Sequence, residues 1–344
     1  MDPITLLEDV ANRDGVGERI VDVLKDAARL VGDDIQLLEE ALVETCESAP
    51  GKLEDVCTHI IQSGGKHVRP ILCLLAYRAC GGDGSLPMDL AANCELLHNA
   101  TLLHDDVIDE GNARRGRPTA RIVFSNALSV LGGDYLLIKT IETVSRRDPR
   151  FMPPYVSTLN QLVSGELTQL LRRGSVQTTE EEYFQIIEGK TASLFRWSVY
   201  SGALAAGAAD EMCRTMGRFG WHVGVAFQLM DDLLDFTAEE TLLGKHLFAD
   251  IQEGKMTLPV ILAAKASPSL RNLLSRLVSG EDDPAISARV AEAVNQSGII
   301  DIVKQYAVDH TTKGLSALHA ISKGRGEIFG VIERLARALL ERNF

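Results

Sequence analysis

The sequence is poor in the residues that sheet proteins and two-domain chains need. Aromatic residues make up only 5% of the 344 residues, and long alternations of Val, Ile, Thr and Tyr, which are typical of half-buried strands, are scarce. No Pro-, Gly- or Ser-rich linker divides the chain, which favours one domain over two. Ala, Leu, Glu and Arg instead recur at spacings of three and four, and this pattern predicts an all-α protein.

A surplus of positive charge is also missing. The formal net charge is -13, and the Lys and Arg residues are scattered or sit in short motifs. A nucleic-acid surface needs a basic patch against the phosphate backbone, so we expect no nucleic-acid partner. An anionic small substrate remains compatible with this charge if bound metal ions supply positive charge locally.

Signals for disulfides, export and membrane insertion are lacking too. The six cysteines include no Cys-x-x-Cys pair, and most lie in apolar helical runs, as expected for reduced core residues. The first 14 residues carry acids rather than a cationic segment followed by an apolar one, so no signal peptide is indicated. The longest stretch of low polarity, residues 199–209, is too short to span a bilayer. We therefore expect a cytoplasmic protein without an integral membrane segment.

Two acidic motifs interrupt otherwise apolar helical segments. The first is Asp105-Asp106-Val107-Ile108-Asp109, and the second is Asp231-Asp232-Leu233-Leu234-Asp235. In each motif the first and last aspartates lie one helical turn apart on the same face. Because buried carboxylates repel one another, this arrangement favours a hard divalent cation between them. We interpret the two motifs as facing walls of one metal and diphosphate site.

Several basic residues are candidates for binding phosphate. Lys66 and Arg69 follow a glycine turn, and Arg114 and Arg115 follow the first acidic motif, where arginine can grip phosphate oxygens with two hydrogen bonds. Each signal is weak alone, since a solvated helix end or simple charge neutralisation would also explain it.

Two polar residues on apolar helices complete the candidate site. His98 precedes Asp105 by two helical turns on one face, and Lys190 lies in a predicted helix over residues 183–200 that is rich in apolar and small residues. The alternatives are a buried, hydrogen-bonded histidine and a lysine that extends to the surface.

Together, these motifs, their order and their spacing resemble the trans-isoprenyl diphosphate synthase (polyprenyl synthetase) family, most of all its medium- and long-chain members. The likeness covers nearly the whole chain. It implies a single all-α domain of antiparallel helices around a deep central cavity, usually homodimeric, with covering helices in residues 1–50, catalytic helices in 51–260 and C-terminal helices in 261–344. The segments similar to family motifs are Gly64-Gly65-Lys66-His67-Val68-Arg69-Pro70, the first acidic motif with Arg114-Arg115-Gly116, Gly189-Lys190-Thr191, Gln228 with the second acidic motif, and Gly244-Lys245 to Gly254-Lys255.

The resemblance implies a Mg²⁺-dependent enzyme that condenses isopentenyl diphosphate head-to-tail with an allylic diphosphate to give an all-trans polyprenyl diphosphate. It implies three Mg²⁺ ions per site when diphosphate is bound, held by Asp105, Asp109, Asp231 and Asp235. Catalytic roles fall on these four, on the supporting Asp106 and Asp232, and on Lys190 and Lys245. The residues implied to bind the two substrates are Lys66, Arg69, His98, Arg114, Arg115, Lys190, Thr191, Gln228, Lys245 and Lys255.

Product length follows from the helix that carries the first motif. If the diphosphate lies at Asp105 and Asp109, the growing tail runs back toward the helix N-terminus over Ala100, Thr101 and then Leu97. One helical turn rises about 5.4 Å, similar to one extended isoprene unit, and no aromatic side chain stands at this first floor. We therefore expect a long-chain product, with geranylgeranyl diphosphate as the alternative. Residues of the facing helix that are candidates for closing the tunnel lower down are Tyr135, Leu137 and Ile138.

Two positions depart from the family pattern. Phe248 stands where glycine is usual, two residues before Asp250, and His67 stands where arginine is common. A non-catalytic regulatory subunit of a heteromeric synthase is therefore an alternative, although all six aspartates are present. A class I terpene cyclase is a weaker alternative, because it would not need Lys66, Arg69 and His98 for a second diphosphate.

Overall fold

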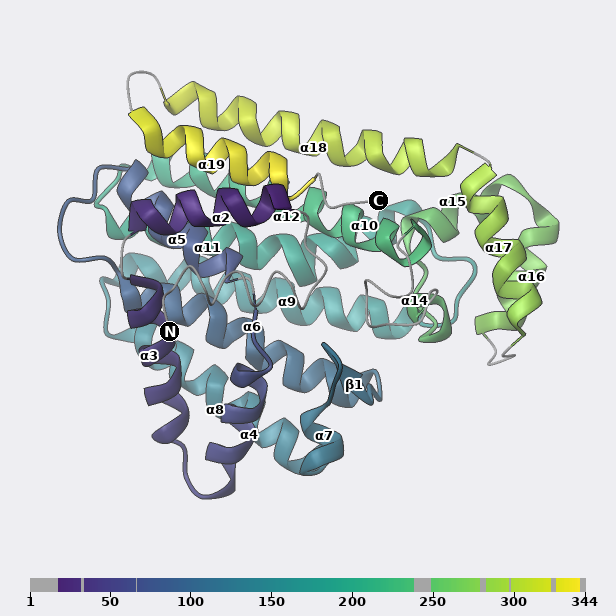
Figure 1. Ribbon diagram of the computed structural model, residues 1–344, viewed down its shortest axis with the longest axis horizontal. Helices are drawn as coiled ribbons and strands as arrows, with labels where there is room; N and C mark the ends of the chain where they lie inside the picture. The colour runs from purple at the N-terminus through teal and green to yellow at the C-terminus, as the bar shows by residue number, and fades with distance from the viewer. Residues whose placement is uncertain are drawn as a thin grey trace.

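The structure, a computed structural model, describes residues 18–31, 34–65, 67–237, 249–278, 283–296, 298–322 and 326–340. Apart from one short hairpin these residues form helices and turns, so the all-α prediction is confirmed (Figure 1). The elements in chain order are α2 (Glu18–Val31), α3 (Asp34–Glu47), α4 (Lys52–Gln62), α5 (Val68–Ala79), α6 (Met88–Ile108), β1 (Ala113–Arg114), β2 (Arg117–Pro118), α7 (Ala120–Val123), α8 (Asn126–Ser145), η1 (Pro149–Phe151), α9 (Met152–Arg172), α10 (Glu180–Ile187), η2 (Glu188–Ala192), α11 (Ser193–Ala205), α12 (Asp210–Thr237), α14 (Ala249–Gln252), α15 (Leu258–Ala266), α16 (Pro268–Val278), α17 (Pro284–Gln296), α18 (Ile299–Ile321) and α19 (Gly326–Ala338).

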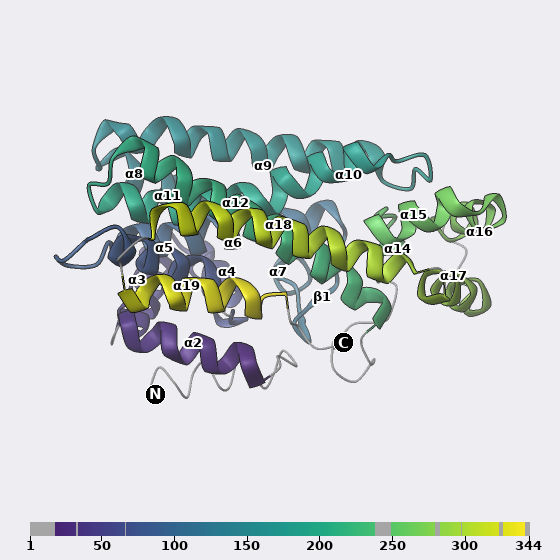
Figure 2. The same ribbon diagram turned by 90° about the horizontal axis from the view of Figure 1, so that it is seen from above.

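The helices pack in layers around α6, α11 and α12. Helix α12 packs against α11 and α18, α6 packs against α8, and α5 packs against α11. In Figure 2, α9 and α10 run along one side of the molecule, and α2 and α19 run along the opposite side. Helices α16 and α17 lie together at one end in both views. Among the described residues, no helix is long and apolar enough to cross a membrane.

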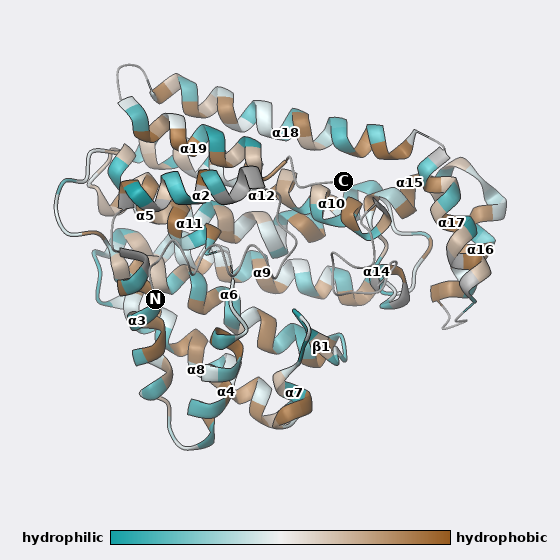
Figure 3. Ribbon diagram, in the orientation of Figure 1, coloured by the Kyte–Doolittle hydropathy of each residue, from teal (hydrophilic) through white to brown (hydrophobic). Residues whose placement is uncertain are grey.

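Helix α12 connects two clusters of buried hydrophobic side chains. Phe219 and Val223 in its first half belong to a cluster shared with α3 to α6 and α11, whereas Leu229 and Leu233 belong to a second cluster shared with α15 to α18. Polar and apolar residues alternate along the outer helices, as Figure 3 shows for α18 and α19, which is the pattern of amphipathic helices on a core. The second acidic motif therefore lies on the helix that both cores hold in place.

Residues 183–200 do not form the continuous α-helix that the sequence predicted, because α10 passes into the π-helical turn η2 before α11 begins. The reason is a close approach to α9. A Cβ atom on Gly189 would lie 2.6 Å from the carbonyl oxygen of Gln161 and 2.8 Å from Cα of Gly165, so only glycines allow this contact. Such π-turns often occur at functional sites, and this one contains Lys190 and Thr191.

The segment after α6 is a tight hairpin. Ala113 pairs with Pro118 and Arg114 with Arg117, and the two turn residues between the strands, Arg115 and Gly116, have φ angles of 50° and 71°. Positive φ at both positions matches a type I′ turn. The left-handed conformation costs a non-glycine residue about 1 kcal/mol, so Arg115 is held in place by its surroundings rather than by its own preference.

Candidate active site

The first acidic motif lies at the C-terminal end of α6. The helix ends at Ile108 with Asp109 as its C-cap and has no basic residue in its last turn. A helix C-terminus carries a partial negative charge, which makes further negative charge there unfavourable. The three aspartates add such charge at this end of α6. The compensating cations come from other elements of the chain.

Asp106 is held by the hairpin. Arg114 donates to its Oδ1 through Nε at 3.0 Å and through Nη2 at 2.8 Å. Burial raises the pKa of Asp106, and the charge of Arg114 opposes this shift. The other oxygen, Oδ2, is buried without a hydrogen-bond partner. In the structure Arg114 binds Asp106, whereas the sequence analysis predicted that Arg114 binds a diphosphate.

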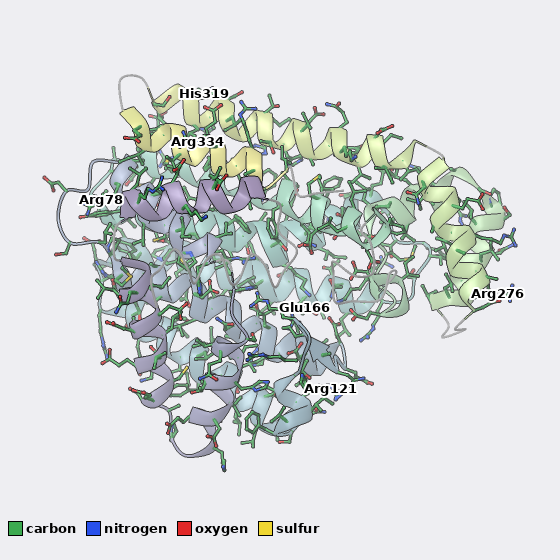
Figure 4. All side chains as sticks on the ribbon, viewed as in Figure 1. Arg78, Arg121, Glu166, Arg276, His319 and Arg334 are labelled. Atoms are coloured by element: carbon green, nitrogen blue, oxygen red, sulfur yellow. The ribbon has the colours of Figure 1, made fainter. Side chains whose placement is uncertain are left out.

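Lys190 of η2 lies between two carboxylates. Its Nζ is 3.6 Å from Oδ2 of Asp105 and also forms an ion pair with Glu166 of α9. Burial raises the pKa of Glu166, and the charge of Asp105 adds to the shift. Figure 4 shows Glu166 near the middle of the molecule, above Arg121. Glu166 was not a predicted site residue, although its neighbour Gly165 permits the close helix approach that brings them together.

Lys255 reaches the first motif from the loop between α14 and α15. Its Nζ lies 2.8 Å from Oδ2 of Asp109 and 2.6 Å from Oε2 of Glu253. Burial alone would lower the pKa of Lys255, but the carboxylates of Asp109 and Glu253 outweigh it and raise the pKa. Three predicted substrate-binding cations therefore converge on the first motif.

The second acidic motif is held by a chain of hydrogen bonds. Asp232 is buried and accepts hydrogen bonds from Nε2 of Gln228 at 2.8 Å and from the hydroxyl of Tyr183 at 2.6 Å. Thr191 in turn donates to Oε1 of Gln228 at 2.7 Å. Burial raises the pKa of Asp232 well above its ordinary value. Gln228 and Thr191, predicted to bind substrate, here orient Asp232, and Tyr183 is a residue the sequence analysis missed.

The π-turn η2 brings the two motifs to one site. Lys190 contacts Asp105 of the first motif, and the next residue, Thr191, contacts Gln228, which holds Asp232 of the second. The two acidic motifs therefore flank one short segment that carries its own cation.

The predicted metal ligands Asp105, Asp109, Asp231 and Asp235 do not form a ready-made cage. Over the part of the chain that the structure describes, no group of three or more His, Cys, Asp or Glu side chains is placed to hold a metal ion. Mg²⁺ is commonly bound by one or two carboxylates together with phosphate oxygens and water. Two separated carboxylate motifs thus fit Mg²⁺ ions whose remaining ligands come from a diphosphate.

His67 forms a buried ion-pair bridge near the predicted second-substrate residues. Its Nε2 lies 2.6 Å from Oε1 of Glu39 in α3, and its Nδ1 lies 3.3 Å from Oε1 of Glu95 in α6. Burial alone would lower the pKa of His67, but Glu95 and Glu39 outweigh it and raise the pKa to about 10. Burial would raise the pKa of Glu95, but the charge of His67 outweighs it and lowers the pKa to about 2. His67 is therefore a cation, as arginine at this position would be.

Arg69, His98 and Arg115 gather on the same side of α6. A Cβ atom on Gly65 would lie 3.4 Å from Nη1 of Arg115, and the Arg69 guanidinium lies 4.8 Å from the ring centroid of Phe195. Burial lowers the pKa of His98 well below its ordinary value, and the charge of Arg69 adds to this. His98 is thus a neutral imidazole that can donate a hydrogen bond. Lys66, Lys245 and Phe248 lie outside the described residues.

The predicted tunnel floor is inside the protein. Leu97 and Ala100 are buried, and the hydroxyl of Thr101 donates to the backbone one turn earlier. Two proposed closing residues on α8 point elsewhere: Ile138 is 54% exposed, and the Tyr135 hydroxyl donates to a backbone carbonyl of α3.

Toward the N-terminus of α6, Asn93 meets a layer of two buried aromatic side chains from neighbouring helices. Asn93 accepts a hydrogen bond from Nε1 of Trp197 at 3.0 Å and donates to the carbonyl of Thr140 at 2.9 Å. The rings of Trp197 and Tyr155 lie 5.0 Å apart, and both side chains are fully buried. Tyr155 comes from α9 and Trp197 from α11, and the sequence analysis assigned neither of them a role.

Two acidic motifs joined through one turn that carries a lysine, with three cations at the first motif, suit an all-α enzyme that handles a diphosphate with divalent metal. A sequence model of the family described as polyprenyl synthetase matches residues 50–297. The chain belongs to the polyprenyl synthetase family and is a trans-prenyltransferase. Family membership implies dependence on a divalent metal and the use of isoprenyl diphosphate substrates.

Curated relatives and solved structures agree over most of the chain. The all-trans-nonaprenyl-diphosphate synthase (geranyl-diphosphate specific) of Rhodobacter capsulatus is 36% identical over 304 residues, which cover 88% of this chain and 93% of the relative. The octaprenyl diphosphate synthase of Escherichia coli (strain K12) is 33% identical over 300 residues, which cover 87% and 93%. The crystal structure of a polyprenyl synthase from Caulobacter crescentus CB15, complexed with calcium and isoprenyl diphosphate, matches with a TM-score of 0.86 and 31% identity, covering 93% of this chain and 98% of that one.

Replacing His67 with glutamine should destabilise the protein in a pH-dependent way. H67Q leaves Glu39 and Glu95 without their shared cation, and we expect the free energy of unfolding to fall by about 3 kcal/mol. Because the folded pKa of about 10 lies above the ordinary 6.5, the contribution of His67 is complete below pH 6.5 and is lost as the pH rises through 10. Urea unfolding at several pH values should therefore show the gap between wild type and H67Q narrowing across that window.

The matched control is H319Q, because His319 pairs with Glu333 at 2.9 Å on the surface. Such exposed pairs contribute about 0–1 kcal/mol. A loss in H67Q no larger than that in H319Q would contradict the buried bridge.

Proposed function

We propose that this protein is a Mg²⁺-dependent polyprenyl diphosphate synthase that extends an allylic diphosphate with isopentenyl diphosphate to an all-trans, long-chain product. The observation that carries this proposal is η2, where Lys190 contacts Asp105 of the first motif and the next residue, Thr191, contacts Gln228, which donates to Asp232 of the second. An allylic diphosphate placed between the motifs would meet carboxylates on both sides and a lysine between them. The names of the nonaprenyl and octaprenyl relatives support a long product.

Asp105, Asp109, Asp231 and Asp235 would hold the Mg²⁺ ions, three per site when diphosphate is bound. The ions would supply Lewis-acid stabilisation of the negative charge on the leaving diphosphate. The spacing of one helical turn within each motif puts each pair of carboxylates on one face, and the buried Asp106 and Asp232 keep the two helix ends rigid through Arg114, Gln228 and Tyr183.

The cations around the first motif would stabilise the leaving group. Arg114, Lys190 and Lys255, together with Lys245, would donate to the diphosphate oxygens as the allylic C–O bond breaks and its electron pair moves onto oxygen. Arg114, Lys190 and Lys255 already face carboxylates, so each of these three cations would keep an anionic partner when a diphosphate binds.

The second substrate would lie on the Glu95 side of α6. Arg69, Arg115 and Lys66 would bind the diphosphate of isopentenyl diphosphate, and neutral His98 would donate one N–H to it. The double bond of isopentenyl diphosphate attacks the allylic cation, a proton leaves the adjacent carbon, and an oxygen of the released diphosphate accepts that proton. None of these reaction steps requires a nucleophile from the protein.

Geranylgeranyl diphosphate is the second candidate product, and a specific observation favours it. The layer of Asn93, Trp197 and Tyr155 crosses α6 12 residues before Asp105, a distance of about 18 Å along the helix. At about one isoprene unit per helical turn, this leaves room for roughly three to four units. A longer tail would have to pass beside Trp197.

The deciding experiment offers the purified protein isopentenyl diphosphate, Mg²⁺ and, separately, dimethylallyl, geranyl, farnesyl or geranylgeranyl diphosphate, with product lengths read by mass spectrometry. We expect a ladder that extends well beyond four isoprene units. A sharp stop at four would assign the geranylgeranyl product. No condensation by folded protein would refute the synthase and favour a regulatory subunit. As a control for adventitious activity, D105N should reduce turnover by about 100-fold.

Substitutions along α6 should set product length. A100F places a ring one turn from Asp105, so we expect its product to shorten by several units while the first condensation stays within about threefold of wild type. W197L removes the ring that would stop a geranylgeranyl tail, so it should lengthen the product of a wild type that stops at four units and leave a longer product unchanged. Unchanged lengths in both variants, measured by the same mass spectrometry, would show that the tail does not follow α6.

We also propose that the protein is a homodimer that pairs through one apolar surface, the α8–α9 face. Monomeric proteins rarely expose large contiguous apolar areas, and in the described residues this face holds most of the large exposed hydrophobic side chains. Val163 is 68% and Leu171 is 71% exposed. The residues of this face are Val130, Leu131, Ile138, Ile141, Val156, Val163, Leu167, Leu170 and Leu171.

V163K should shift the protein from dimer to monomer, because it places a charge in the centre of the paired surface. The control is V308K on α18, because Val308 is 46% exposed and lies outside the α8–α9 face. Light scattering after size exclusion gives the mass of each. A wild-type monomer, or equal masses for both variants, would contradict pairing through this face.

A further inference from the structure

Arg173, the C-cap of α9, bridges two segments of the candidate active site. Its Nη1 donates to the carbonyl of Ile108 at 3.0 Å and its Nη2 to the carbonyl of Asp109 at 3.4 Å. Its Nε donates to the carbonyl of Glu253 at 2.9 Å. One guanidinium therefore links the end of α6 to the loop that carries Lys255.

The backbone reinforces this contact. The N–H of Gly174 donates to the carbonyl of Gly254 at 2.8 Å. A Cβ atom on Gly254 would lie 3.1 Å from Cγ of Arg173 and 3.1 Å from the nitrogen of Gly174, and Gly254 has a φ of +76°. Glycine is thus required for the loop to press against the end of α9. The next residue, Lys255, donates its own N–H to the carbonyl of Asp250 at 2.7 Å.

The electrostatics explain why an arginine is suited to this position. Ile108 and Asp109 carry C-terminal carbonyls of α6, which lack partners within the helix, and α6 has no basic residue in its last turn. Charged N–H groups make stronger hydrogen bonds to such carbonyls than neutral ones do. Arg173 therefore caps α6 from another helix, and at the same time it keeps Lys255 2.8 Å from the carboxylate of Asp109.

We propose that Arg173 is a positioning residue for prenyl transfer: it holds the Lys255 loop against the end of α6, so that Lys255 and Asp109 meet the allylic diphosphate together. The inference rests on the proposed function, because it assigns the allylic site to these two residues. It requires no contact between Arg173 and substrate.

The test compares R173A and R173K with R172A. Arg172 is the neighbouring residue on α9, but its side chain pairs with Glu182 of α10 instead of α6, so it is a matched control. We expect R173A to raise the KM for the allylic diphosphate about tenfold while the KM for isopentenyl diphosphate changes by less than about twofold. R173K should restore part of the loss, since one ammonium cannot reach all three carbonyls. R172A should resemble wild type.

A second measurement needs no catalytic activity. Hydrogen exchange without substrates should be faster in R173A than in R172A at the amides of Gly254 and Lys255, which donate within this loop. G254A, which disturbs the same contact from the loop side, should act in the same direction and serves if R173A does not fold. Faster exchange in R173A than in R172A, together with a folded wild type that catalyses no condensation, would uphold the contact but refute the proposed function. Faster exchange with an unchanged ratio of the two KM values, or R173A equal to R172A in both measurements, would overturn the positioning role.

Discussion

The constraint on which the site depends is the placing of carboxylates at the C-terminal ends of α6 and α12. Neither helix has a basic residue in its last turn, and both ends carry the negative pole of the helix dipole. Burial of Asp106 and Asp232 adds a desolvation cost that raises the pKa of each carboxyl. Folding therefore has to bring positive charge and hydrogen-bond donors from elsewhere in the chain, and much of the observed architecture achieves this.

Backbone proximity supplies much of that compensation. Gly165 and Gly189 let α9 and η2 touch, which places Lys190 between Asp105 and Glu166. The hairpin holds Arg114 against Asp106. These ion pairs give the buried carboxylates positively charged partners. The same cations are available to bind a diphosphate. Local concentration of positive charge reconciles a net charge of -13 with the isoprenyl diphosphate substrates that family membership implies.

The sequence predicted the helices and both acidic motifs because each is a local pattern: carboxylates one turn apart in an apolar segment need no partner to be recognised. It also selected Arg114, Lys190 and Lys255, which the structure places beside the first motif. What it missed are residues defined by distant partners. Tyr183 acts on Asp232 across 49 positions, and Arg173 acts on Ile108 across 65. Helical periodicity tells which face of a helix is apolar, but not which other helix will meet it.

The bridge through His67 shows how such a partner changes the meaning of a sequence difference. Taken alone, histidine in place of arginine at position 67 suggests that a positive charge is lost. With Glu39 at 2.6 Å and Glu95 at 3.3 Å, however, the imidazole has a pKa of about 10 and remains a cation at neutral pH. Glu39 belongs to α3, in the N-terminal layer that sequence analysis assigned only a covering role. That layer therefore takes part in the charge balance beside the residues proposed to bind the second substrate, because removing Glu39 would lower the pKa of His67 and weaken its hold on Glu95.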